Sequence, residues 1–324
     1  MPFIYLVTGV LLLGLTLVDI IKTTLVFTHT GGPVTERLTN LLWHMLPKRT
    51  KAAIYVGPLL LLSVVVLWLV LSWLAWWLIF NSTPEAVINA QTKQEASATA
   101  RFYFVGFNLF TLGIGDFVPQ GGLWRFVTIL SAAQGFFVIT LSITYVLPVI
   151  SAITERRQLA RQLYFLGEDP ATLLLSHWNG QNFGVLEDRL MSLLPNLILL
   201  EQRNFTYPVL HYFLERQRSV AIEPGIVVLD EAMTLLRHGF VDTPTPQLVI
   251  IDNIQRIVRA YLDTLQAQYI TPADTPLAET SHETLHAAGF SVVATAQYHL
   301  ALEDHHQHRR NLHALLIHSG WDQD

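Results

Sequence analysis

The sequence predicts an all-α membrane protein that joins a membrane half to a water-soluble helical half. Hydrophobic residues make up 51% of the 324 residues and charged residues only 14%, which is unusual for a soluble protein. The apolar residues concentrate in the first half, whereas charges and eleven of the thirteen histidines occur from Thr154 onward. We therefore expect three parts, residues 1–52, 53–153 and 154–324, of which the first two form the membrane half.

Three apolar stretches are long enough to cross a bilayer, which requires about 20 residues. They cover residues 3–27, 53–80 and 123–152. The first has neither a basic n-region nor an A-x-A-like cleavage site, so we predict a retained helix instead of a signal peptide. Between the first two stretches, residues 34–46 place apolar side chains at helical spacing. This pattern predicts a short amphipathic helix on the inner membrane interface.

Basic residues predict the orientation of the membrane helices. The segment 29–52 carries four basic residues against one acid, and Arg156, Arg157 and Arg161 follow the third apolar stretch. Residues 82–122 are poor in basic side chains. By the positive-inside rule, the N-terminus and residues 82–122 lie outside, and the C-terminal part lies in the cytoplasm.

Two charged residues and several tryptophans occur inside the first two apolar stretches. Asp19 and Lys22 are three residues apart, so they share a helix face and can pair. Ionisable residues at membrane depth mark function. The alternative is that both lie near the inner end, with Lys22 extending to the headgroups. Four tryptophans of the second stretch are typical of an interfacial aromatic belt, namely Trp68, Trp73, Trp76 and Trp77.

The most specific motif lies between the second and third stretches and reads Thr111-Leu112-Gly113-Ile114-Gly115-Asp116. Glycines alternate with apolar residues, and glycine reaches the positive-φ region that lets successive carbonyls point at one axis. The preceding segment, Ala98 to Phe110, is apolar and aromatic but too short to cross a bilayer. We predict a helix that enters halfway and returns as an extended loop, with its negative C-terminal end favouring a cation.

This order of elements resembles the potassium channel pore domain over residues 53–152, with one additional helix in front. The resemblance is to bacterial two-helix channels, and it implies a selectivity filter. The backbone carbonyls of residues 111–114, together with the Thr111 hydroxyl, would form the ion sites, and Gly115 the outermost ring. One filter per chain implies a homotetramer surrounded by membrane lipids in a bacterial plasma membrane. Potassium ions would be the cargo, and the protein would not be an enzyme.

The resemblance also assigns supporting residues. Asp116 would lie behind the filter and bond to Tyr103, whereas Phe107 stands where relatives often have a glutamate. Gly135, about twenty residues beyond Gly115, matches the inner-helix hinge, and close helix packing is the alternative interpretation. Ile139 and Ile143 would face the cavity above the gate. The narrowest apolar ring is expected near Leu147 or Ser151, and Pro148 between them removes a helix hydrogen bond at the hinge or gate.

The C-terminal part reads as a helical regulatory domain of unknown ligand. His282-Glu283-Thr284-Leu285-His286 matches the zincin string H-E-x-x-H, which gives a membrane-anchored zinc hydrolase as an alternative function. His299, His306 and His313 are seven residues apart, which predicts one helix face. That face is either a proton or divalent-metal sensor or a solvated surface. His282 and His286 join these three as candidate metal ligands.

Composition and missing motifs exclude several function classes. The absence of cysteine excludes disulfides and thiolate metal sites. Dispersed basic residues and a net charge of −5 give no nucleic-acid footprint. There is no G-x-G-x-x-G loop after a strand and no run of short alternating strands, so we predict no resident cofactor. The sequence thus favours passive potassium conduction gated by the cytoplasmic domain, with a non-selective cation channel as the alternative.

Overall fold

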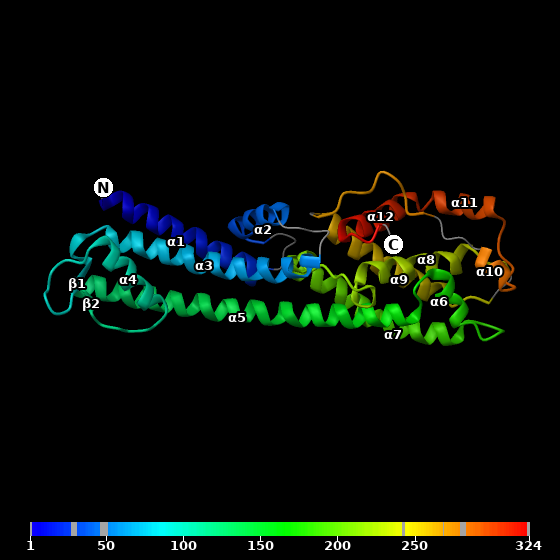
Figure 1. Cartoon of the computed structure of the whole chain (residues 1–324), viewed down its shortest axis with the longest axis horizontal. Helices are drawn as coiled ribbons and strands as arrows, with labels where there is room; N and C mark the ends of the chain where they lie inside the picture. The colour runs from blue at the N-terminus through cyan, green and yellow to red at the C-terminus, as the bar shows by residue number, and fades with distance from the viewer. Residues whose placement is uncertain are drawn as a thin grey trace. The chain divides into compact units, whose positions relative to one another are not determined.

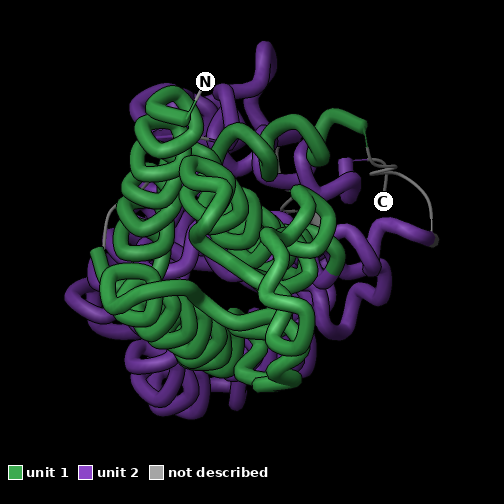
Figure 2. The backbone as a smooth tube through the Cα atoms, turned by 90° about the vertical axis from the view of Figure 1, so that its left-hand side faces the viewer, with its two compact units in different colours: residues 1–45, 59–148 green, residues 46–58, 149–324 purple. Residues whose placement is uncertain are grey.

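Helices dominate the structure, and the one sheet in its described part has two strands (Figure 1). The computed structural model describes residues 2–26, 31–45, 51–241, 244–267, 269–278 and 283–322. The chain divides into two compact units, shown in Figure 2. Unit 1 comprises residues 1–45 and 59–148, and unit 2 comprises residues 46–58 and 149–324. The all-α class predicted from the sequence is confirmed.

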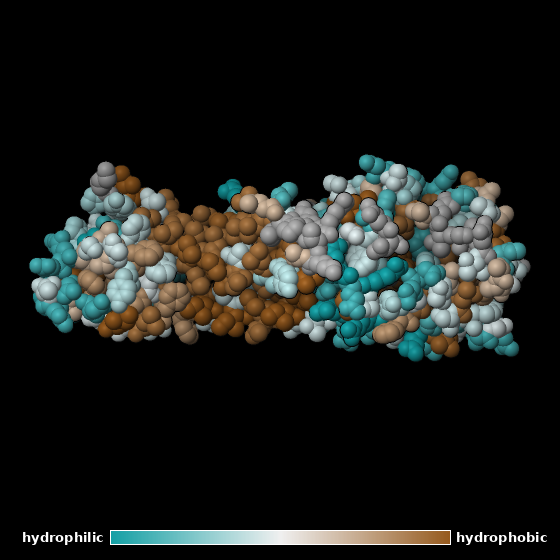
Figure 3. All heavy atoms as spheres, viewed as in Figure 1, coloured by the Kyte–Doolittle hydropathy of each residue, from teal (hydrophilic) through white to brown (hydrophobic). Residues whose placement is uncertain are grey.

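Three long helices form the body of unit 1. They are α1 (Pro2–Thr24), α3 (Val56–Asn81) from Leu59 onward, and α5 (Gly121–Leu166) as far as Pro148. Each belongs to a segment long and apolar enough to cross a membrane. Figure 3 shows hydrophobic residues gathered over these helices and hydrophilic residues over the end of unit 1 that carries the small sheet. The predicted boundary after residue 153 falls inside α5, which continues without interruption to Leu166.

The predicted half-helix is present as α4 (Ala98–Leu109). It begins at Ser97, whose side-chain oxygen accepts a hydrogen bond from the backbone N–H of Ala100 at 3.2 Å. Gly106 lets α4 approach α3 closely, since an added Cβ would lie 2.5 Å from a ring carbon of Trp73. The helix is therefore fixed at its start by a cap and along its length by packing.

The tryptophans of α3, which the sequence predicts to form an interfacial belt, also hold the neighbouring helices. Trp68 is fully buried. The indole N–H groups of Trp73 and Trp77 donate to the carbonyls of Phe102 and Ala98 on α4, each at 2.9 Å. Trp76 donates to Gln134 on α5. Buried indoles need such acceptors, and these three bonds fix α4 and α5 against α3.

Two short strands, one before α4 in the sequence and one after it, pair as an antiparallel sheet. Strand β1 (Val87–Asn89) pairs with β2 (Phe117–Pro119) and follows the short 3-10 helix η2 (Pro84–Ala86). Arg101 of α4 is buried and donates to Asn81 and to the Pro84 carbonyl, which ties α4 to this segment. The sequence predicted only a polar outer segment here.

Hydrogen bonds from α2 and α3, and not an ion pair with Lys22, stabilise the carboxylate of Asp19. Its carboxylate is fully buried, and it accepts hydrogen bonds from the backbone N–H groups of Val34 (2.7 Å) and Thr35 (3.1 Å). It also accepts from the Thr35 hydroxyl and from the Trp68 indole at 2.9 Å. Lys22 is exposed on α1. Asp19 thus caps the N-terminus of α2 (Pro33–Met45) and binds it to α1 and α3.

Unit 2 is a helical domain around one apolar core, as predicted. Its centre is α9 (Leu248–Gln266), which packs against α7 (Gly184–Thr206) and α8 (Ile222–His238). The remaining elements, together with the last part of α5, surround this centre. They are η1 (Lys51–Tyr55), α6 (Pro170–Ser176), η3 (Pro208–Tyr212), η4 (Arg218–Val220), α10 (Glu283–Ala287), α11 (Thr295–Glu303) and α12 (His306–Ser319).

Two buried arginines link helices across unit 2. Arg309 of α12 binds both carboxylate oxygens of Glu231 on α8, at 2.6 and 2.8 Å. Arg156 of α5 binds Glu223 at the start of α8 and also donates to the Leu210 carbonyl at 2.8 Å. Paired in this way, buried charges fix the register of the helices that carry them, and removing one partner of such a pair costs about 3–5 kcal/mol.

Candidate functional site

The predicted filter leaves the end of α4 as a non-helical loop. The backbone N–H groups of Thr111 and Leu112 still donate to Asn108 and Phe107, at 3.0 and 2.8 Å. From Leu112 the chain has no regular secondary structure until β2 begins at Phe117. The C-terminal end of α4, with its partial negative charge, is therefore the immediate neighbour of the loop.

The backbone of this loop alternates in handedness. Thr111, Gly113 and Gly115 have φ values of +55°, +60° and +84°, while Leu112 and Ile114 between them stay at negative φ. Alternation of this kind turns successive N–H groups to one side of the ribbon and the carbonyls to the other. Thr111 is not a glycine, so its left-handed conformation costs about 1–3 kcal/mol, a cost typical of functional loops.

The outer end of the loop is fixed by two contacts. The Asp116 carbonyl accepts from the backbone N–H of Ala90 at 2.9 Å, and the next residue begins β2. The Asp116 carboxylate also lies near Tyr103, as predicted. Partial desolvation, followed by the charge of Asp116 and a side-chain hydrogen bond to it, raises the pKa of Tyr103. Phe107 contributes a ring contact with Tyr103, at 5.3 Å between centroids.

The side chains of the loop are largely exposed on a single chain. Leu112 is 66% exposed and Ile114 is 52% exposed, and a Cβ added at Gly113 would meet nothing within 4 Å. Large apolar side chains in such positions are typical of a surface that another molecule covers. A single chain therefore supplies one wall of a site and leaves the remaining walls open.

Gly135 lies directly behind the end of α4, which agrees with close packing, the alternative to a hinge. A Cβ at this position would lie 2.4 Å from the Leu109 carbonyl oxygen and 2.8 Å from the Leu109 Cα. The adjacent Gln134 bridges α5 to α3, because its amide nitrogen donates to Ser72 at 3.0 Å. Gly135 is thus the residue that lets α5 support the start of the filter.

The predicted gate residues share an exposed face of α5. Ile143 is 56% exposed, Leu147 is 60% exposed, and Ser151 is also exposed. Ile139 is half-buried. Pro148 lies inside α5, which continues as a helix on both sides of it. The structure thus leaves these side chains available to line a cavity and does not break the helix at the proline.

The candidate metal ligands are not brought together. His282 lies outside the described residues, and His286 is exposed on the five-residue helix α10. His299 belongs to α11, whereas His306 and His313 belong to α12. The chain turns at residues 304–305, so one helix face does not carry all three, contrary to the prediction. Across the described part of the chain, no group of three or more metal-binding side chains is arranged to hold an ion.

A different histidine cluster joins α8 to the start of α12, and the seven-residue spacing did not reveal it. His308 contacts the buried Asp230 at 2.9 Å, and the rings of His238 and His305 are 5.5 Å apart. Burial lowers the pKa of His238, and the neighbouring His305 and Arg237 lower it further. Burial, Arg259 and the neighbouring His308 likewise lower the pKa of His305.

These shifts predict that unit 2 loses stability in mild acid. Below the usual histidine pKa of about 6.5, the unfolded chain takes up protons that folded His238 and His305 resist, so unfolding becomes more favourable as the pH falls. We expect the melting temperature of the detergent-solubilised protein to fall between about pH 7 and pH 5.5. The fall should be smaller in His238→Gln/His305→Gln. Equal falls in both proteins would contradict the assignment.

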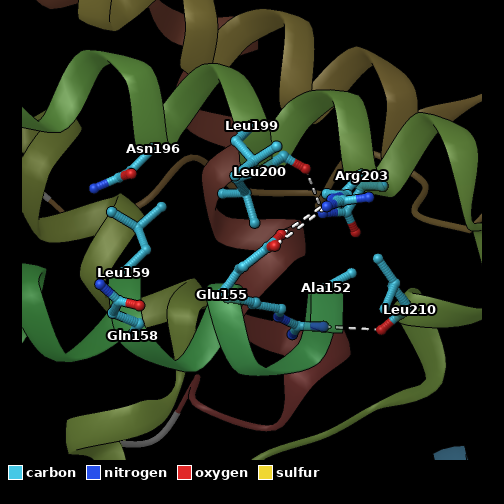
Figure 4. A pocket seen from close by; sticks show the side chains of 11 residues that line it. Ala152, Glu155, Gln158, Leu159, Asn196, Leu199, Leu200, Arg203 and Leu210 are labelled. Atoms are coloured by element: carbon cyan, nitrogen blue, oxygen red, sulfur yellow. Dashed lines mark hydrogen bonds and ion pairs between the residues drawn. The ribbon is translucent and has the colours of Figure 1, made fainter. Parts of the chain in front are cut away.

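Unit 2 also contains a small pocket that sequence reasoning missed (Figure 4). It has a volume of about 50 Å³ and lies between α5 and α7. Arg203 crosses it to bind Glu155, with N–O distances of 3.0 and 3.2 Å. The space suits a few water molecules. Its residues come from helix faces without local sequence signals, so only the fold brings them together.

Comparison with known proteins agrees with this geometry. A family model described as "Ion channel" matches residues 63–152, which include α4, the loop and most of α3. The "Uncharacterized membrane protein YdjJ" of Bacillus subtilis (strain 168) is 33% identical over 312 residues, which cover 95% of this chain and 92% of that protein. No solved structure matches the chain. The chain is therefore a membrane protein that belongs to the two-helix ion channel family.

Proposed function

We propose that four copies of the chain form a potassium-selective channel, with residues 111–115 of each copy as the filter. The observation that carries this proposal is the alternating backbone of the loop, with positive φ at Thr111, Gly113 and Gly115. Carbonyls on one side of four such ribbons would replace the hydration shell of a dehydrated cation. The negative end of α4 would favour a cation at the inner mouth.

Three features support the assembly of four copies. Each chain carries one filter loop, and a ring of coordinating carbonyls needs several. Leu112 and Ile114 are exposed on the isolated chain, so neighbouring copies would cover them. The exposed face of α5 with Ile143 and Leu147 would then surround a common cavity. The site would be complete only in the oligomer.

We further propose that unit 2 regulates the pore from the cytoplasm of a bacterial plasma membrane. The segments rich in arginine and lysine flank the inner ends of the spans, which supports this orientation. α5 is one uninterrupted helix, and its Arg156 is bound to Glu223 and to the Leu210 carbonyl. A shift of α8 within unit 2 would therefore act on the same helix that lines the cavity.

The test is a flux assay in liposomes that contain the purified full-length protein. We expect potassium flux well above sodium flux in the wild type, and loss of potassium flux in Gly113→Ala, because alanine disfavours φ near +60°. Gly122→Ala is the matched control, since its added Cβ would meet nothing within 4 Å.

Each outcome of this assay has a distinct meaning. Equal potassium and sodium fluxes in the wild type would favour a non-selective cation channel, an outcome consistent with Phe107 at the usual position of a supporting glutamate. Unchanged flux in Gly113→Ala would contradict the assignment of this loop as the filter.

A further inference from the structure

Helix α2 has three chemically different faces. At about 100° per residue, all of its residues except Pro33 and Leu42 fall on three ridges along the helix axis. The buried ridge consists of Thr35, Thr39 and Trp43. An apolar ridge consists of Val34, Leu38, Leu41 and Met45, and a polar ridge consists of Glu36, Arg37, Asn40 and His44. A surface helix of a soluble domain has two faces, so the third face needs an explanation.

The buried ridge is not the apolar one, since two of its three residues are threonines. Thr39 donates its hydroxyl to the carbonyls of Thr35 and Glu36, each at 3.0 Å. α2 packs with this ridge inward and contacts α1, beside which it lies in Figure 1. Asp19 fixes the N-terminus through the N–H groups of Val34 and Thr35. The orientation of α2 about its own axis is therefore determined by contacts inside unit 1.

This orientation turns the apolar ridge away from the protein. Leu41 is 60% exposed and Met45 is 73% exposed, while Val34 and Leu38 are half-buried. Each exposed Leu or Met side chain forgoes about 1.5–3 kcal/mol of burial. All four members of the polar ridge are exposed. Two outward ridges of opposite character fit a boundary between an apolar and an aqueous phase.

Exposed apolar side chains also occur on α1 near Asp19. Val18, Ile21 and Leu25 are 41–51% exposed and lie within two turns of Asp19, the residue that holds α2. They belong to or directly follow a helix that is apolar enough to cross a membrane. Exposed apolar side chains of α1 and the apolar ridge of α2 therefore both occur near Asp19, toward the C-terminal end of α1.

We propose that the apolar ridge of α2 inserts into the bilayer at the acyl-chain boundary, while the polar ridge faces headgroups and water. The occupant of this surface is lipid, and Asp19 holds the lipid-contacting helix to the pore-domain helix α3 through Trp68. The proposal does not depend on which ion the channel passes. A second copy of the chain is the competing occupant.

The chain has no cysteine, so single labels can be placed without background. We would attach an environment-sensitive fluorophore to Leu41→Cys and Met45→Cys on the apolar ridge, and to Arg37→Cys and His44→Cys on the polar ridge. All four positions are exposed, so the substitutions preserve the core. The full-length protein is then placed in liposomes whose lipids carry brominated acyl chains, which quench fluorophores at membrane depth.

We expect strong quenching at Leu41 and Met45 and clearly weaker quenching at Arg37 and His44. Equal quenching on both ridges, or none on the apolar ridge, would overturn the proposal. Efficient disulfide crosslinking between copies through Leu41→Cys, without quenching there, would assign the surface to a second copy instead. The two apolar-ridge variants serve as independent repeats, so that failure of one to fold leaves the test intact.

Discussion

Gly135→Ala is expected to abolish ion flux, even though it adds a single methyl group at a helical position where alanine is normally favoured. The added Cβ would lie 2.4 Å from the Leu109 carbonyl oxygen, and the clashing atoms belong to backbone that cannot rotate away. Such overpacking costs about 1–3 kcal/mol and displaces the weaker partner. That partner is the last turn of α4, which continues directly into the filter loop. Potassium flux in liposomes measures the effect.

Stability measurements separate this packing role from a hinge role for Gly135. A hinge requires flexibility, so replacing it by alanine would stiffen α5 and leave the melting temperature unchanged or raised. The packing role predicts a lower melting temperature together with lost flux. Gly122→Ala, in the same helix but with open space around it, should keep both flux and stability. A stable but inactive Gly135→Ala protein would contradict the packing assignment.

Features that depend on neighbouring residues in the sequence could be predicted from it. The three spans follow from continuous apolar runs, and the half-helix follows from a run that is too short to cross. The filter loop follows from glycine spacing, because only a few residue types reach positive φ. Its handedness at Gly113 and Gly115 agrees with that expectation. Thr111 at +55° was not foreseen, since threonine rarely takes that conformation.

Contacts between distant segments could not be predicted from spacing alone. Trp73 and Trp77 look like an interfacial belt in the sequence, but their acceptors lie 29 and 21 residues away on α4. The strand pairing that fixes Asp116 depends on residues 87–89, which carry no strong strand pattern. The seven-residue histidine spacing suggested one helix, yet the chain turns at residues 304–305. In the first two cases a tertiary contact decided the outcome over a local propensity.

Asp19→Ala is expected to be among the most destabilising single substitutions in unit 1. It removes the acceptor of two backbone N–H groups, the Thr35 hydroxyl and the indole of the fully buried Trp68. Each buried donor left without an acceptor costs about 1–3 kcal/mol. The Trp68 indole would keep only its longer bond to the Thr35 hydroxyl, at 3.3 Å. We expect a large fall in the melting temperature in detergent and faster proteolysis around the released α2.

A graded series identifies which contacts of Asp19 matter. Asp19→Asn keeps one carbonyl oxygen for the N–H groups of Val34 and Thr35, but its NH₂ group cannot accept from the Trp68 indole. Its stability should therefore lie between those of the wild type and Asp19→Ala. Lys22→Ala should have almost no effect, because Lys22 is exposed on α1. If Lys22→Ala instead destabilised the protein as much as Asp19→Ala does, an Asp19–Lys22 ion pair would be the better account. Equal stability of Asp19→Asn and the wild type would place the whole role of Asp19 in capping α2 and none in the bond to α3.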